Sequence, residues 1–186
     1  IVLDALANSL MSEEKTSSAL QLWYILGFED RLNQVAHGAE ARGDLNLAEQ
    51  AYQTAYNISP ESYTESLVRT LNAQDKNTEA ISVLKLSLEN YPDFVSRTKW
   101  WWILGDIYQQ NKQFDQAKKA YQQALSEDSE NIAALIRLGW LAYNLDQDIG
   151  KATKYIIKAI EVEPEKGDGY YNMGKILYED KQYTYA

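Results

Sequence analysis

The chain has 186 residues, with 18 Lys and Arg against 27 Asp and Glu, a formal net charge of −9 at pH 7. This balance argues against nucleic-acid binding, which depends on clustered Lys and Arg that displace counterions from phosphates. There is no cysteine and a single histidine, His37. Disulfides, thiolate nucleophiles and multi-histidine or cysteine-ligated metal sites are therefore excluded. No apolar run reaches the roughly 18 residues of a membrane helix, so we expect no membrane insertion by this segment.

The composition predicts helices along the whole chain. Only three prolines and nine glycines occur, in a sequence rich in Ala, Leu, Gln, Glu and Lys, which are good helix formers. The pattern A-x-x-A-Y-x-x-A stands at 48–55 and 117–124, and looser copies recur elsewhere. Its leading alanines are spaced by 29 to 37 residues: Ala19, Ala48, Ala80, Ala117, Ala152 and Ala186. Such a period is typical of stacked helical repeats.

In chain order, the first three predicted repeats are 1–28, 29–62 and 63–94. Each begins with a helix whose apolar residues recur at the three- and four-residue spacing of one helix face. Repeat 1–28 is degenerate, and repeat 63–94 departs from the pattern at Thr64 and Val68. The first-helix positions are Leu3, Leu6, Ala7 and Leu10 in the first repeat and Leu32, Val35, Ala36 and Ala39 in the second.

The later predicted repeats are 98–131, 132–166 and 167–186. Residues Val95 to Arg97 precede them as a three-residue insertion, and the turn at 146–151 carries one extra residue. The last repeat is partial, with a first helix and the start of a second. The first-helix positions are Trp101, Leu104, Gly105 and Tyr108, then Leu135, Leu138, Gly139 and Ala142, then Tyr170, Met173, Gly174 and Leu177.

These patterns predict how the two helices of a repeat pack. Trp101, Leu104 and Tyr108 share one face of the first helix, and small residues such as Gly105 let the backbone of the second helix approach. Proline lacks an amide donor and is expected to end each second helix; the three prolines are Pro60, Pro92 and Pro164. A single pair cannot bury its apolar face, so neighbouring pairs must stack. The predicted fold class is all-α, an α-solenoid of stacked antiparallel helix pairs in one array over 1–186.

These repeat positions resemble those of the tetratricopeptide repeat, a helix–turn–helix repeat of about 34 residues. The match is nearly complete over 98–131 and looser over the rest of the chain. The resemblance implies a right-handed superhelix whose first helices line a concave groove for other proteins. Chaperone-adaptor repeats use Lys, Asn and Arg on successive first helices to bind a C-terminal carboxylate. No frame of this chain supplies that cationic clamp, so this subtype is disfavoured.

The resemblance also implies which side chains face the groove. Aromatic rings there are costly to leave exposed and are natural anchors for a partner. The alternative is that Trp140 and Tyr143 pack between adjacent repeats. Trp101 is expected in the core, and Trp100 has no assigned place. The implied groove residues are Lys99, Trp102, Asp106, Gln109, Ile136, Arg137, Trp140, Tyr143, Asp168, Tyr171, Asn172, Lys175 and Tyr178.

No catalytic site is predicted, and with it no metal and no cofactor. His37 and Glu40 lie three residues apart and can form a His–carboxylate pair, for which a solvated surface pair is the simpler interpretation. The glycines Gly167, Gly169 and Gly174 lack the preceding strand and the spacing of a phosphate-binding loop. The sequence therefore predicts a non-enzymatic protein.

Three functions fit these patterns. The first is a protein–protein interaction scaffold that binds a partner helix or an extended peptide along the groove. The second is a recognition domain of a larger protein, because similar repeats are attached to envelope-polysaccharide polymerases and ligases, secretion factors and glycosyltransferases. The missing initiator Met and the end at Ala186 favour this second hypothesis. The third is a carbohydrate-binding groove, since Trp and Tyr rings stack on sugars.

The expected partner is a protein or a peptide. The open C-terminal end also predicts a homodimer in which two copies pair through the apolar face of the last repeat. The sequence is compatible with a cytoplasmic segment, or with an extracytoplasmic one if the host is a membrane protein.

Overall fold

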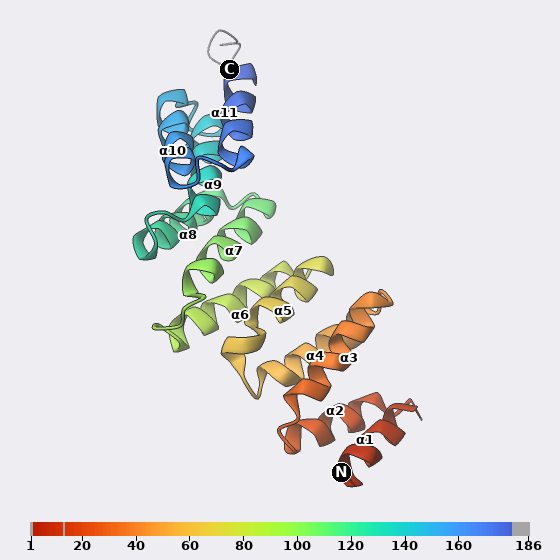
Figure 1. Cartoon of the computed structure of the whole chain (residues 1–186). Coiled ribbons are helices and arrows are strands. Elements are labelled where there is room, and N and C mark those ends of the chain that lie inside the picture. Colours follow the sequence, from red (N-terminus) through yellow and green to blue (C-terminus); the bar gives the residue numbers. More distant parts are fainter. Residues whose placement is uncertain (1, 13, 180–186) are drawn as a thin grey trace. The chain divides into compact units, whose positions relative to one another are not determined.

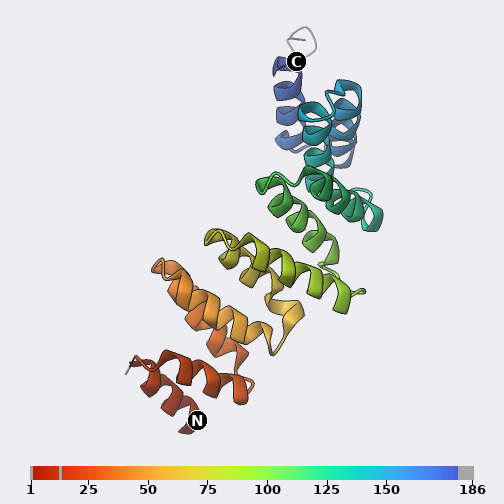
Figure 2. The ribbon, with the colours of Figure 1, turned by 180° about the vertical axis from the view of Figure 1, so that it is seen from behind.

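The computed structural model describes residues 2–12 and 14–179, and this part of the chain contains eleven α-helices and no strand. Consecutive helices are joined by short turns (Figures 1 and 2). The helices gather into two compact units, residues 1–94 and 95–186, hereafter the N-terminal and the C-terminal unit. The border between the units coincides with the predicted insertion at Val95 to Arg97.

The N-terminal unit consists of three helix pairs. They are α1 (Val2–Ser12) with α2 (Thr16–Ile25), α3 (Glu29–Ala41) with α4 (Leu45–Tyr56), and α5 (Pro60–Ala73) with α6 (Asn77–Asn90). Helix α4 packs on both α3 and α5, which joins the second pair to the third. The alanines of the repeated pattern on α4, Ala48, Ala51 and Ala55, are completely buried. Because alanine is small, it allows neighbouring helices to approach closely.

Pro60 does not end a helix, as the sequence had predicted, but begins one. It occupies the first turn of α5, where a missing amide hydrogen costs nothing because the first N–H groups of a helix have no intrahelical partner. The predicted border between repeats 29–62 and 63–94 therefore falls inside α5. Pro92 and Pro164 lie in the turns that follow α6 and α10.

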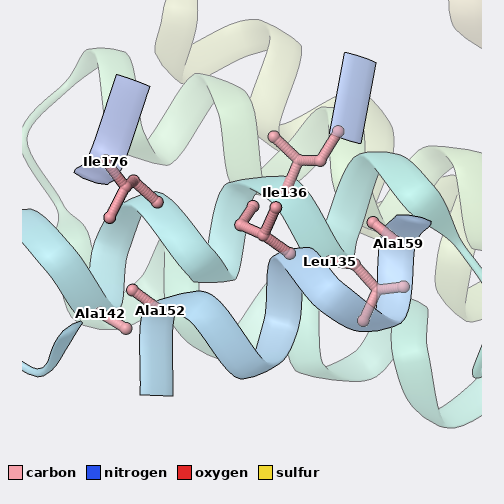
Figure 3. Packing of buried hydrophobic residues seen from close by; sticks show 7 residues of the cluster. Leu135, Ile136, Ala142, Ala152, Ala159 and Ile176 are labelled. Atoms are coloured by element: carbon pink, nitrogen blue, oxygen red, sulfur yellow. The ribbon is translucent and has the colours of Figure 1, made fainter. Parts of the chain in front are cut away.

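The C-terminal unit contains two pairs and a further helix. The pairs are α7 (Arg97–Gln110) with α8 (Phe114–Glu127) and α9 (Ile132–Asn144) with α10 (Ile149–Val162), followed by α11 (Gly167–Glu179). Figure 3 shows Leu135 of α9 close to Ala159 of α10 at one end of the core and Ala142 of α9 close to Ala152 of α10 at the other, and Ile176 of α11 belongs to the same cluster. The predicted start of a second helix in the last repeat, with Ala186, lies outside the described residues.

The glycines predicted at close helix contacts differ in their surroundings. A Cβ added to Gly105 would lie 2.4 Å from Cε1 of Tyr121, and one added to Gly139 would lie 2.8 Å from Cδ1 of Ile156. Both glycines therefore permit a close approach of the second helix. Gly174 was assigned the same role, and among the described residues no atom comes within 4 Å of a Cβ placed there; the second helix predicted to pack on it lies outside them.

Of the two adjacent tryptophans Trp100 and Trp101 on α7, the one that was not assigned a place is the one in the core. Trp100 is completely buried and starts the buried stripe that continues at Leu104 and Ile107. Trp101, expected in the core, is only partly buried. Its indole N–H donates to Glu127 Oε1 at 2.8 Å, and the guanidinium of Arg97 lies 5.8 Å from the ring centroid. These polar partners hold the Trp101 ring at the edge of the pair.

No helix in the described part of the chain is both long enough and apolar enough to span a bilayer.

Candidate functional site

The candidate site is a strip of side chains on the first helices of the C-terminal unit. We define the first-helix strip as Trp102 and Asp106 of α7, Arg137 and Trp140 of α9, and Asn172 and Lys175 of α11. Spacings of three and four residues place the members of each helix on one face. Side-chain contacts join members of neighbouring helices at two junctions, Asp106 with Arg137 and Trp140 with Asn172 and Lys175.

The first junction joins α7 to α9 through an ion pair. The Arg137 guanidinium donates from Nε to Asp106 Oδ1 at 2.7 Å and from a terminal nitrogen to Oδ2 at 3.1 Å. The hydroxyl of Tyr121 on α8 donates to the same carboxylate at 2.6 Å, and Gln109 Oε1 lies 3.1 Å from that hydroxyl. A bidentate guanidinium–carboxylate pair has a fixed geometry. The Arg137 side chain is therefore held in place although it is 43% exposed.

The pKa shifts at this junction follow from its contacts. Burial, and then the hydrogen bond to Asp106, raise the pKa of the Tyr121 hydroxyl. The hydrogen bond to Asp106 also raises the pKa of Arg137, against the effect of burial. At physiological pH the hydroxyl is therefore a donor and the guanidinium is a cation.

The second junction joins α9 to α11 through Trp140. The Trp140 indole N–H donates to Asn172 Oδ1 at 2.7 Å, and the Lys175 ammonium lies 4.6 Å from the ring centroid. On the other side, the ring of Tyr143 makes an edge-to-face contact at 6.0 Å between centroids. Asn172 is oriented in turn, because its amide donates to the backbone oxygen of Asp168 at 2.7 Å. The Trp140 ring is thus packed between neighbouring helices.

The other predicted groove residues are not joined to these junctions by the contacts described above. Trp102 is half-buried, and Lys99 is exposed. Tyr171 and Tyr178 on α11 are 71% and 65% exposed, and Ile136 is buried in the core. Among the predicted groove residues, Tyr171 and Tyr178 are therefore the most exposed aromatic rings and Trp102 is partly exposed, while Trp140 and Tyr143 pack against each other.

The N-terminal unit contains related junctions that the sequence analysis did not identify. Glu40 on α3 accepts from the hydroxyl of Tyr52 on α4 at 2.9 Å and from Arg69 on α5 at 2.9 Å. Asp4 on α1 accepts from the Trp23 indole on α2 at 2.9 Å and from Arg31 on α3 at 2.8 Å. A carboxylate on one first helix thus binds an aromatic of its own pair and an arginine of the next first helix. The signal in the sequence that could have revealed these junctions is an arginine about one repeat length after each acidic residue, Arg31 after Asp4 and Arg69 after Glu40.

These junctions lower carboxylate pKa values. Hydrogen bonds from Trp23 and then Arg31 hold the pKa of Asp4 below its usual range. Partial burial raises the pKa of Glu40, but the bonds from Tyr52 and Arg69 outweigh it, and the net direction is down. Burial and then Glu40 raise the pKa of Tyr52 to about 12. Each carboxylate is therefore charged at neutral pH.

The predicted pair of His37 and Glu40 lies at one of these junctions. The imidazole Nδ1 is 3.4 Å from Glu40 Oε2 and 3.1 Å from the Tyr52 hydroxyl. Because Glu40 also binds Arg69, the carboxylate serves as the centre of an inter-helix contact. Within the described residues, no group of three or more His, Asp and Glu side chains is arranged to hold a metal ion.

A sequence comparison finds one repeat family in the chain. The model of the family described as tetratricopeptide repeat matches residues 98–131. A curated relative, the N-terminal acetyltransferase A complex auxiliary subunit NAA15 of Arabidopsis thaliana, is 35% identical over 72 residues. This match covers 39% of the chain and only 8% of the relative.

Solved structures resemble the chain over most of its length. A tetratricopeptide repeat protein from Parabacteroides merdae aligns with a TM-score of 0.68 and 20% identity, over 83% of this chain and 62% of the other. The type IV pilus biogenesis factor PilW aligns with a TM-score of 0.67 and 14% identity, over 98% of this chain and 88% of the other. At these identities, the likeness establishes the fold.

Proposed function

We propose that the chain, which matches the tetratricopeptide repeat family over residues 98–131 and shares the fold of such arrays, is a non-enzymatic scaffold whose C-terminal unit binds a partner peptide or helix along the first-helix strip. Solenoids of this kind use extended surfaces for binding. The observation that carries the proposal is the combination of open aromatic rings with fixed polar groups on one face. Trp102 on α7 and Tyr171 on α11 offer apolar surface. Arg137 lies on α9, the first helix between them in the chain, and Asp106 fixes its side chain.

The energetics favour a partner that buries these rings and uses the remaining donors of the guanidinium. Aromatic and arginine side chains dominate binding energy at protein interfaces. Arg137 binds Asp106 through Nε and one terminal nitrogen. The other N–H groups of this half-exposed side chain can therefore donate to a partner. Because the geometry is already fixed, a partner loses little side-chain entropy from this residue on binding.

The test is selection of binding peptides from a displayed library, followed by affinity measurement with the purified chain. The variants Trp102→Ala and Tyr171→Ala are expected to weaken the selected peptides by about tenfold or more each, as loss of interface anchors does. Tyr24→Ala is the matched control, because Tyr24 is an exposed aromatic on α2 of the N-terminal unit. Circular dichroism first establishes that all variants are folded.

Equal weakening by the control would refute this location of the site. Oligosaccharides that quench tryptophan fluorescence in the wild type, and do so less in Trp102→Ala, would favour the carbohydrate-binding alternative. Peptide binding that is detected only when the chain is part of a longer host protein would favour the recognition-domain alternative. The relative from Arabidopsis thaliana, named as an auxiliary subunit of an enzyme complex and matched over 8% of its length, supports a role as part of a larger assembly.

We also propose that two copies can pair through α11. Tyr170 is 53% exposed on this helix, and no described residue comes within 4 Å of a Cβ placed on Gly174, where the equivalent glycines meet a second helix. Sedimentation equilibrium of the wild type against Tyr170→Glu tests this proposal. A dimer that dissociates in the variant supports it, and a dimer unaffected by the substitution places the interface elsewhere.

A further inference from the structure

A basic surface lies on the second helix of the α9–α10 pair. Lys151, Lys154 and Lys158 follow one another at intervals of three and four residues on α10, so they share one side of the helix. Ile157, 47% exposed, lies among them. A hollow runs along this side and is also lined by Thr153 and Tyr155. We call this surface the lysine face.

Within the described part of the chain, two of the three lysines of the lysine face have no ion-pair partner, and the third, Lys151, shares Asp146 with Lys118. Lys154 and Lys158 form no ion pair there, and Lys151 lies 3.6 Å from Asp146, which binds Lys118 more closely at 2.8 Å. Glu161 borders the hollow at its far end without pairing with a lysine. The uncompensated cations stand out in a chain whose net charge is −9.

Repulsion between like charges opposes the α10 helix slightly. Like charges four residues apart on a helix, such as Lys154 and Lys158, repel each other by a few tenths of a kcal/mol. Lys151 lies in the first turn, where the helix dipole favours an anion over a cation. Asp146 and the N-cap Asp148 already supply anions at the start of α10, but an external anion beside Lys154 and Lys158 would relieve their repulsion, which favours a ligand outside the described chain.

The chemistry of the lysine face distinguishes between classes of ligand. A bilayer requires an apolar helix face to insert, but the apolar residues of α10, Ala152, Ile156 and Ala159, are buried in the core. A nucleic acid requires many phosphate contacts by Lys and Arg, and the acidic chain repels its backbone. A partner helix with carboxylates at the same three- and four-residue spacing can pair with the lysines. An aliphatic residue on that helix can cover Ile157.

We propose that the lysine face is a second docking surface, which binds an acidic amphipathic helix of a partner protein. This surface is carried by a second helix, whereas the first-helix strip lies on first helices. It is therefore independent of the function proposed above. The chain then holds one partner by aromatic anchors and another by charge, which is a bridging role for a scaffold.

The test uses the whole 186-residue chain and labelled helical peptides of about 18 residues, long enough to form a helix in solution. One peptide carries Glu at positions i and i+4 with Leu at i+3, and its counterpart has Lys in place of each Glu. Fluorescence anisotropy measures binding at low and high salt. We expect binding of the acidic peptide alone, weakened as salt screens the charges.

The variant K154E/K158E is expected to lower the affinity for the acidic peptide by about tenfold or more, since two opposite-charge contacts become repulsive. K112E/K119E is the matched control, because it changes the net charge equally at two exposed lysines of the same unit, and it should retain most of the affinity. Trp102→Ala should leave this binding unchanged, which separates it from the first-helix strip. The variant K154R/K158R, which keeps both positive charges, should retain the affinity for the acidic peptide that K154E/K158E loses.

Three results overturn the proposal. The first is no binding of the acidic peptide at about 1 mM, a concentration that reveals even weak complexes. The second is an equal loss of affinity in both double variants, which indicates a general effect of net charge. The third is lysine-dependent binding of phosphatidylserine vesicles or single-stranded DNA in preference to the peptide, which assigns the surface to a membrane or to a nucleic acid.

Discussion

At the residue scale, equivalent positions of the repeat differ in what surrounds them. Gly105 and Gly174 occupy the same place in their repeats, and a Cβ clashes with the Tyr121 ring at the first but meets no described residue within 4 Å at the second. The sequence predicts a small residue at both positions. Only the structure shows that Gly105 lies against an aromatic ring, because the neighbouring atoms come from another helix.

Alanine substitution at these two glycines isolates the packing contribution. Both variants gain about the same helix propensity, up to about 1 kcal/mol for Gly to Ala. Gly105→Ala additionally pushes a Cβ to 2.4 Å from the Tyr121 ring. We expect it to be less stable than Gly174→Ala by about 1–3 kcal/mol, the usual cost of overpacking. Urea denaturation followed by circular dichroism measures the difference, and equal midpoints would contradict the expectation.

The junction at Glu40 predicts a pH dependence of stability. The folded pKa of Glu40 lies below its ordinary value, so the folded state favours the charged carboxylate. The stabilisation is complete above the unfolded pKa of about 4.3 and is lost as pH falls through the lower, folded pKa. We therefore expect acid to destabilise the wild type more than the variant Glu40→Gln.

The measurement compares free energies of unfolding in urea at neutral and acidic pH for both proteins. At neutral pH the variant should be less stable by about 0.5–1 kcal/mol, as expected for a partly exposed ion pair. The gap should narrow as pH falls below 4. Parallel pH profiles would show that Glu40 has the same pKa in both states.

At the scale of helices and turns, the turn between the two helices of each pair repeats one backbone feature, a residue in the left-handed conformation. One residue of each turn has a positive φ: Glu14, Gly43, Asp75, Lys112 and Gln147. Only one of the five is glycine, which has no Cβ and therefore adopts this conformation without a steric clash. Three helix starts are capped by side chains that accept from the N–H three residues on: Asp44, Asn131 and Asp148.

The turn at Gly43 gives a prediction that depends on backbone alone. Its φ is +76°, and a Cβ there would meet no atom within 4 Å. Gly43→Ala should lower the free energy of unfolding by about 1 kcal/mol, because an L-residue is strained at this angle. Gly167→Ala is the control, since Gly167 also has open surroundings but no positive φ. Thermal unfolding of both variants tests this, and an unchanged Gly43→Ala would contradict it.

Helices were more predictable than the contacts between them. The spacing of Leu104, Gly105 and Tyr108 depends on the helix period, so it indicates the buried face directly. The prediction for Trp101 was wrong because its neighbour Trp100 is also large and apolar, and periodicity does not choose between adjacent rings. Pro60 is compatible with either end of a helix, and the sequence alone favoured the wrong one.

The candidate site was predicted as a set of residues, but not as a network. Positions such as Asp106 and Arg137 follow from the repeat. Their ion pair does not, because it joins residues 31 positions apart through side-chain rotamers. The predicted alternative for Trp140, packing between adjacent repeats, agrees with its contacts to Asn172 and Lys175. Its role as a ligand anchor stays a prediction.

At the scale of the whole molecule, the chain divides where its repeat pattern is interrupted. Residues 1–94 contain 14 acidic and 6 basic residues, whereas residues 95–186 contain 13 and 12. The N-terminal unit thus holds almost all of the negative net charge. This asymmetry is consistent with a partner-binding lysine face in the C-terminal unit, where acidic side chains do not dominate.

The interruption also predicts where a protease cuts first. Between α6 and α7 the chain has no helix, and Val95 is 94% exposed. A protease needs an exposed, locally extended substrate, which helices within a packed pair do not provide. Elastase, which cleaves after small aliphatic residues, should therefore first cut after Val95 and release two fragments of nearly equal length. Mass spectrometry identifies the site, and Val95→Asp should slow this cut selectively. A first cut within α3 to α5, at an unchanged rate in the variant, would show that local unfolding of the N-terminal unit is easier than cleavage of the loop between the units.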